Sequence, residues 1–146
     1  MNTYQKIKFL KFRRHMDAMR IKRLSDGFLG ETLVFNKIVP KIKGLGDFNT
    51  PLGTLAFNSV KMDLSVISTF LRNGAYNKND ILRMIIKSEK DIDRFVLRAN
   101  GRIKQINRMA EDVGINKQRE IQLYAEDIAK AKRVNGILAR LEVAFS

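Results

Sequence analysis

The sequence predicts an all-α protein: a long antiparallel helical hairpin within a three- to four-helix bundle, plus a basic amphipathic N-terminal helix. Three observations favour this fold class. Apolar residues between positions 77 and 146 recur at intervals of three, four and seven, as one helix face requires. The only strand-like stretch would lack a pairing strand. The composition, 45% hydrophobic and 29% charged over 146 residues, is that of one folded domain.

Residues 1–25 contain no Gly or Pro and predict a helix or arm that is separate from a bundle over 26–146. They carry eight Lys or Arg against one acid, a net +7 out of the chain's +13. The remaining charge is +1 over 26–76 and +5 over 77–146. One apolar stripe of this helix consists of Phe9, Phe12, Met16 and Met19.

Three functions fit such a helix: an arm along phosphates, a helix docked on an acidic groove, or a membrane-surface or targeting helix. Asp17 and the scarcity of hydroxyl residues make the third the least favoured. An anionic partner is expected in either of the first two cases. The predicted binding residues are Lys6, Lys8, Lys11, Arg13, Arg14, Arg20, Lys22 and Arg23.

Residues 28–39 are apolar and β-branched enough for helix or strand, and the absence of a pairing strand favours helix. Pro40 is predicted to end this element. Residues 41–53 then predict the longest loop, because Gly, Pro and Asn supply turns. Long loops are often functional. Leu45, Phe48 and Leu52 are predicted to contact a protein partner, with packing over the core as the alternative.

Thr54 is predicted to cap the next helix, which runs to Leu71 and stops at Asn73-Gly74. This helix is predicted to pack on the hairpin as part of the core. Its expected core face contains Leu55, Val60, Leu64, Ile67 and Leu71, with Phe57 and Phe70 beside it.

The hairpin is predicted over 77–146, with Asn77 capping the first arm, Gly114 ending it and Asn116 capping the second. Its short turn makes the arms antiparallel neighbours. The first arm's apolar face contains Ile81, Ile85, Ile92, Phe95, Ala99, Ile103, Ile106, Ala110 and Val113, with Ser88 in one gap. The second arm's face contains Ile121, Tyr124, Ile128, Ala131, Leu138, Leu141 and Phe145.

Two Asn-Gly pairs, Asn100-Gly101 and Asn135-Gly136, lie inside the predicted arms, where each glycine costs about 1 kcal/mol relative to alanine. One interpretation is a tolerated kink or the close approach of a neighbouring side chain. The other is a hinge.

Catalytic and ligand motifs are absent. The chain has no cysteine and one histidine, His15, so a thiolate site, a histidine zinc site or a Ser-His triad cannot be assembled within it. The acidic cluster of Glu89, Asp91 and Asp93 is interpreted as forming helix salt bridges with neighbouring cations. No cofactor or metal is predicted, and the protein is not expected to be an enzyme.

The sequence therefore favours a non-enzymatic structural or accessory component of a large assembly, such as a viral particle or other nucleoprotein complex. The alternative is an autonomous nucleic-acid-binding protein of low specificity. Expected partners are other subunits, with DNA or RNA as the alternative; self-association through Tyr124 and Phe145 stays open. A membrane span would need a run of about eighteen apolar residues, and the sequence contains none. No secretory signal is recognised either. The expected location is intracellular (cytoplasmic or nucleoid-associated) or inside an assembled particle.

Overall fold

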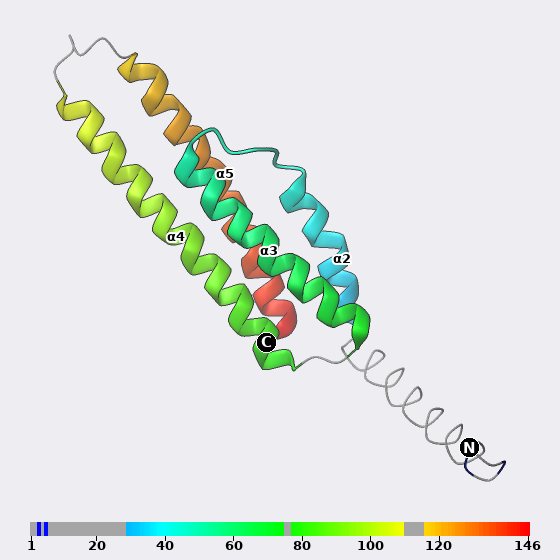
Figure 1. Cartoon of the computed structure of the whole chain (residues 1–146). Coiled ribbons are helices and arrows are strands. Elements are labelled where there is room, and N and C mark those ends of the chain that lie inside the picture. Colours follow the sequence, from blue (N-terminus) through cyan, green and yellow to red (C-terminus); the bar gives the residue numbers. More distant parts are fainter. Residues whose placement is uncertain (1–2, 4, 6–28, 75–76, 110–115) are drawn as a thin grey trace.

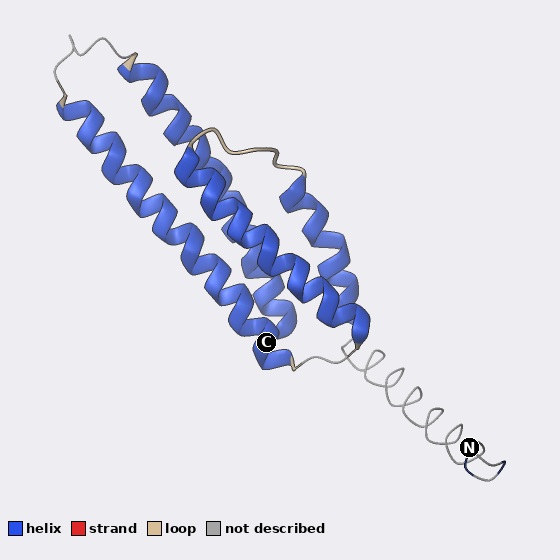
Figure 2. Ribbon diagram, viewed as in Figure 1, coloured by secondary structure: helices blue, strands red, loops and turns tan. Residues whose placement is uncertain are grey.

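The computed structural model describes residues 3, 5, 29–74, 77–109 and 116–146, and within these it contains helices and loops but no strand (Figure 2). The helices are α2 (Leu29–Lys43), α3 (Pro51–Asn73), α4 (Lys78–Arg108) and α5 (Lys117–Phe145). Consecutive helices run in opposite directions, and the main interfaces join α4 to α5, α3 to α4 and α2 to α5 (Figure 1). The predicted all-α bundle is confirmed, whereas the predicted basic helix falls, except for residues 3 and 5, on residues outside this description.

The hairpin of α4 and α5 begins each arm as predicted. The Asn77 side chain accepts a hydrogen bond from the backbone N–H of Asn79 at 2.9 Å, and the Asn116 side chain accepts one from Arg119 at 3.1 Å. Each bond satisfies a first-turn donor that the helix itself leaves free. The end of α4 differs from the prediction, because the helix stops at Arg108 rather than near Gly114.

The buried face of the hairpin follows the predicted period. On α4 the buried residues are Ile81, Ile85, Ser88, Ile92, Phe95, Ala99 and Ile106. On α5 they are Asp127, Ile128, Ala131, Val134, Leu138, Leu141 and Phe145. Phe145 is buried and is therefore not an exposed edge through which the chain could pair with a copy of itself, while Tyr124 is half-buried.

Both helices of the hairpin continue through their internal glycines. A β-carbon at Gly101 or Gly136 would meet no heavy atom within 4 Å, so the close-approach interpretation is wrong. Neither position breaks its helix. The hinge interpretation stays a prediction.

Gly101→Ala and Gly136→Ala are expected to stabilise the protein by about 0.4–1 kcal/mol each, because alanine lowers the backbone entropy of the unfolded chain. Urea unfolding followed by circular dichroism measures the change. A lower midpoint in either variant would contradict the open surroundings of these glycines.

Helix α2 corrects the predicted end at Pro40, because it continues through that residue to Lys43. Pro40 is exposed, and the buried Ile38 and Ile42 on either side hold the backbone against the core. The Pro40 carbonyl still accepts a hydrogen bond, from the N–H of Gly44 at 2.9 Å. The stabilisation from packing the apolar face of α2 is therefore larger than the cost of the backbone hydrogen bond that proline cannot donate.

Helix α3 begins earlier than predicted. Thr50 is its N-cap, and its hydroxyl accepts from the N–H of Gly53 at 3.1 Å, with Pro51 in the first turn. The predicted cap at Thr54 is therefore wrong, and the loop shortens from 41–53 to 44–50. At the other end Gly74 adopts φ 65°, the left-handed stop predicted for Asn73-Gly74.

A fully buried carboxylate on α5 fixes the start of α3. Asp127 accepts hydrogen bonds from the N–H of Asn49 at 2.7 Å, from the N–H of Thr50 at 2.8 Å and from the Thr50 hydroxyl at 2.6 Å. Its residue exposure is 0%. The approach is close enough that a β-carbon at Gly53 would lie 2.6 Å from an Asp127 oxygen. Asp127 thereby sets the position of the first turn of α3.

Candidate protein-docking surface

Helix α3 carries apolar residues on two faces. The core face consists of Gly53, Phe57, Val60, Leu64, Ile67 and Leu71. A second, exposed set forms what we term the apolar stripe: Leu52, Leu55, Met62, Val66 and Phe70. Leu55 is 70% exposed and Met62 is 71% exposed, whereas soluble surfaces usually show such residues singly. Among the described helices, none covers this stripe.

The prediction that Leu55 belongs to the core face and that Phe70 lies beside it is wrong, because both side chains are exposed. The five-residue interval from Leu55 to Val60 turns a helix by about 500°, which sends the two side chains to different faces. With Ser59 included, the stripe has intervals of three, four, three, four and four, which is itself a helical period. That second period was the sequence signal for this surface.

A groove of about 340 Å³ runs between the first half of α3 and α4. Its lining combines apolar side chains with cations, namely Leu52, Leu55, Ala56, Ser59, Lys87, Asp91, Arg94, Phe95 and Arg98. The start of the apolar stripe, at Leu52 and Leu55, thus borders positive charge on its α4 side.

Five cations on α4 form what we term the basic row, of which the second, fourth and fifth line the groove: Arg83, Lys87, Lys90, Arg94 and Arg98. Their spacing of four, three, four and four residues places them along one strip of the helix. All five are exposed. Within the part of the chain that the structure describes, no carboxylate pairs with Lys90 or Arg98.

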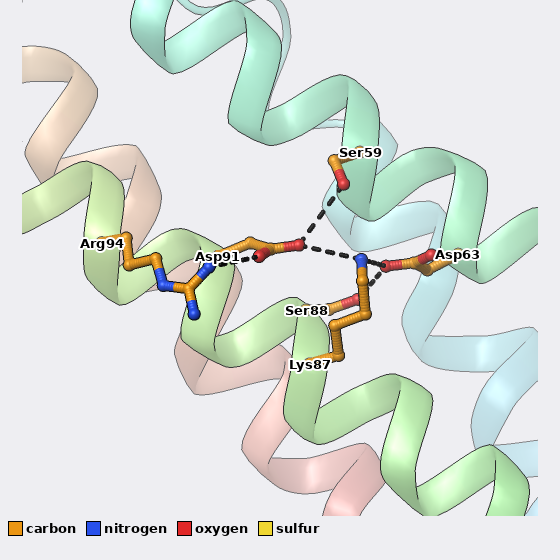
Figure 3. A network of polar contacts seen from close by, with 6 residues as sticks. All are labelled: Ser59, Asp63, Lys87, Ser88, Asp91 and Arg94. Carbon is orange, nitrogen blue, oxygen red and sulfur yellow. Dashed lines mark hydrogen bonds and ion pairs between the residues drawn. The ribbon is translucent and has the colours of Figure 1, made fainter.

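Polar contacts join α3 to α4, and several of the residues that make them also line the groove (Figure 3). The Lys87 ammonium lies 3.1 Å from Asp63 on α3 and 3.1 Å from Asp91 on its own helix. Ser88, which filled a gap in the predicted apolar face, donates to Asp63 at 2.9 Å. Ser59 donates to Asp91 at 3.4 Å, while Arg94 lies 3.9 Å from that carboxylate. Asp91, the carboxylate of the groove lining, and the nearby Asp63 are therefore already engaged.

The hydrogen bond to Asp91, followed by that to Asp63, raises the pKa of Lys87 above its ordinary value. Lys87 therefore stays charged at neutral pH and serves as a fixed bridge between the two helices. By contrast, the Arg94 side chain is 72% exposed and its contact with Asp91 is long, so Arg94 is free to reorient towards a partner.

The acidic cluster on α4 behaves in two ways. Asp91 forms the predicted helix salt bridges with Lys87 and Arg94. The other two acids face α5 instead: Asp93 accepts a hydrogen bond from Asn135 at 2.7 Å, and Glu89 lies against Glu142. For Glu89 and Asp93, no ion pair is found among the described residues, so the salt-bridge interpretation is wrong for them.

Burial, the hydrogen bond with Glu142 and repulsion from Glu142 and Asp93 raise the pKa of Glu89 to about 7. The folded state therefore binds this proton more tightly than the unfolded chain does. The stabilisation is complete below the ordinary carboxyl pKa of 4.5 and is lost as the pH rises through about 7.

Glu89→Gln is expected to raise stability at about pH 8 by on the order of 1 kcal/mol, and to change it much less at about pH 5. Glu142→Gln should act in the same direction, because it removes the like charge. Urea midpoints at the two pH values measure both effects, with the exposed Glu126→Gln as the control. Equal shifts at both pH values would contradict a shared proton between α4 and α5.

The residues predicted to bind partners have different outcomes. The eight cations of residues 6–23 lie outside the described residues. Phe48 is only 6% exposed and contacts the rings of Phe57 at 4.8 Å and Phe95 at 5.9 Å, so the alternative of packing over the core applies to it. Leu45 is half-buried. Leu52 is exposed in the first turn of α3 and lines the groove.

In the described ranges, no group of three or more His, Cys, Asp or Glu side chains is placed to hold a metal ion. None of the described helices combines the length and apolar character of a membrane span. No protein-family model matches the chain, and neither a curated protein nor a solved structure matches it significantly.

Proposed function

We propose that the protein is a non-enzymatic structural or accessory component of a large macromolecular assembly, such as a viral or other nucleoprotein particle. The observation that carries the proposal is the apolar stripe on α3, which stays exposed beside the basic row on α4. Helix α3 has apolar residues on two faces, and only one of them is buried in the bundle. A partner protein that covers the exposed face would remove its apolar side chains from water, which is favourable. The long hairpin serves as the strut that presents this face.

The basic segment 1–25 is the second proposed contact. Its net charge of +7 favours an acidic protein surface or phosphates. Together the two surfaces give the chain one apolar and one electrostatic attachment, which suits an adaptor between subunits.

Deleting residues 1–25 is expected to leave a cooperatively melting bundle and to abolish most binding to the anionic partner, because the chain falls from +13 to +6. Thermal melting followed by circular dichroism tests the first part, and affinity capture from the protein's native source tests the second. Aggregation of the truncated protein would instead place Phe9, Phe12, Met16 and Met19 in the core. A full-length monomer that captures no protein would overturn the proposed function.

A second candidate function is low-specificity nucleic-acid binding, which the row of exposed cations on α4 also favours. With about six phosphate contacts, affinity for a random duplex should fall about 10³- to 10⁵-fold between roughly 50 and 200 mM salt. A flat salt dependence, or no duplex binding at low salt, would exclude this candidate.

A further inference from the structure

We propose that the apolar stripe and the basic row together bind one acidic amphipathic helix of another protein. The stripe supplies a seam of exposed large side chains, and the groove beside it supplies a hollow between α3 and α4. An amphipathic helix docks in such a groove through residues at positions i, i+3, i+4 and i+7.

The dimensions of the stripe define the length of the partner helix. Leu52 and Phe70 are eighteen residues apart on one helix, a distance of about 27 Å at a rise of 1.5 Å per residue. A partner helix of about five turns covers that length. Its apolar residues pack between the stripe's own side chains, as in a two-helix seam.

The cations on α4 determine which charges the partner helix should carry on the side that faces α4. The contacts of Lys87 and Ser88 occupy Asp63, while Lys87, Ser59 and Arg94 surround Asp91. The groove therefore has no spare carboxylate with which to neutralise Arg98, and Lys90 in the same basic row also has no ion pair among the described residues. Glutamate or aspartate on one side of a docked helix completes these pairs, and arginine offers two-pronged hydrogen bonding to each carboxylate.

The opposite side of the stripe is polar. There Asn58, Ser65 and Thr69 are exposed next to the apolar residues on α3, and Ser65 and Thr69 line a second hollow together with Lys61 and Arg72. The longest row of exposed cations lies on the α4 side, so the partner's acids are expected mainly on the flank that faces α4.

Other occupants fit this charge pattern less well. A second copy of the chain would bring its own basic row against the first, and the chain's own residues 1–25 carry +7. Both contacts place like charges together. Nucleic acid satisfies the cations but leaves the apolar stripe in water. An acidic amphipathic helix satisfies both features at once.

A selection experiment with the full-length protein tests the proposal. A displayed library of helix-forming peptides about twenty residues long, randomised at surface positions, is selected on the immobilised protein and counter-selected on its Leu55→Asp variant. The expected winners combine apolar residues at three- and four-residue intervals with acids on one flank. Fluorescence anisotropy of the synthesised winners then gives dissociation constants.

Variants of the two surfaces separate their contributions. Leu55→Asp is expected to weaken the selected peptide at least about tenfold, and so is the double change Arg94→Glu with Arg98→Glu. The charge-reversed protein should bind a peptide whose acids are replaced by lysines. The control variants are Leu97→Asp and Arg108→Glu, which alter exposed residues of α4 outside the groove lining and should leave affinity within about twofold.

Several results would overturn the inference: no enrichment over the counter-selection, winners without acids, or affinity that ignores the arginine reversals. A dimer in sedimentation that Leu55→Asp disperses would assign the surface to a second copy. Binding to phosphatidylserine vesicles that the same change abolishes would assign it to a membrane. The inference rests on the proposed function only in requiring a protein partner. If residues 1–25 recruit a subunit while the selection fails, the proposed function stands and this inference falls.

Discussion

Leu138→Asp is expected to unfold the protein at room temperature or leave it only marginally folded. Leu138 lies in the core of the hairpin and is fully buried on α5. An aspartate there must stay ionised without a partner or take up a proton, and either outcome costs several kcal/mol. Domains of this kind are stable by only about 5–15 kcal/mol in total. Ile92→Asp, at an equally buried position on α4, should have the same effect.

The matched control lies five residues further along the same helix. Val143 is 76% exposed, so Val143→Asp introduces the same charge without burying it and should change stability by less than about 0.5 kcal/mol. Thermal melting followed by circular dichroism compares the variants. If Leu138→Asp melts like Val143→Asp, the α4–α5 interface is not the centre of the fold.

Asp127→Ala is expected to destabilise the protein by roughly 3 kcal/mol, because it removes one acceptor group from three donors. The N–H of Thr50 is buried and would have no replacement partner. Asp127→Asn keeps the shape but turns an NH₂ group towards a donor, so an intermediate loss is expected. The neighbouring Glu126 is exposed and accepts a single side-chain hydrogen bond from the same loop, from Asn49 at 2.9 Å, so Glu126→Ala is expected to cost less.

Loss of the Asp127 hydrogen bonds is also expected to affect the docking surface on α3. The Asp127 carboxylate holds the residues that open α3, and Leu52 and Leu55 follow within the first turns. Loss of the anchor should therefore weaken a docked helix more than the charge change alone explains. Chemical denaturation gives the stability, and amide hydrogen exchange at the start of α3 reports the local release. Unchanged exchange protection in Asp127→Ala would show that packing of Phe48 suffices to hold the loop.

The sequence by itself determined the fold class and the hairpin. The apolar period and the asparagine caps at Asn77 and Asn116 depend on residues a few positions apart, where helix geometry alone fixes which side chains share a face. The end of α3 at Gly74 is equally local, because it requires a left-handed backbone conformation that glycine adopts readily.

Only the tertiary structure decided which face of α3 is buried and how its start is held. Both faces have a helical period, and the choice between Leu55 and Phe57 depends on where α4 lies. The partners of Asp127 are about 77 residues away in sequence, a relation that no local pattern carries. The end of α2 was predicted wrongly for a related reason. Packing of Ile38 and Ile42 against the core extends the helix past Pro40, although proline by itself tends to end a helix.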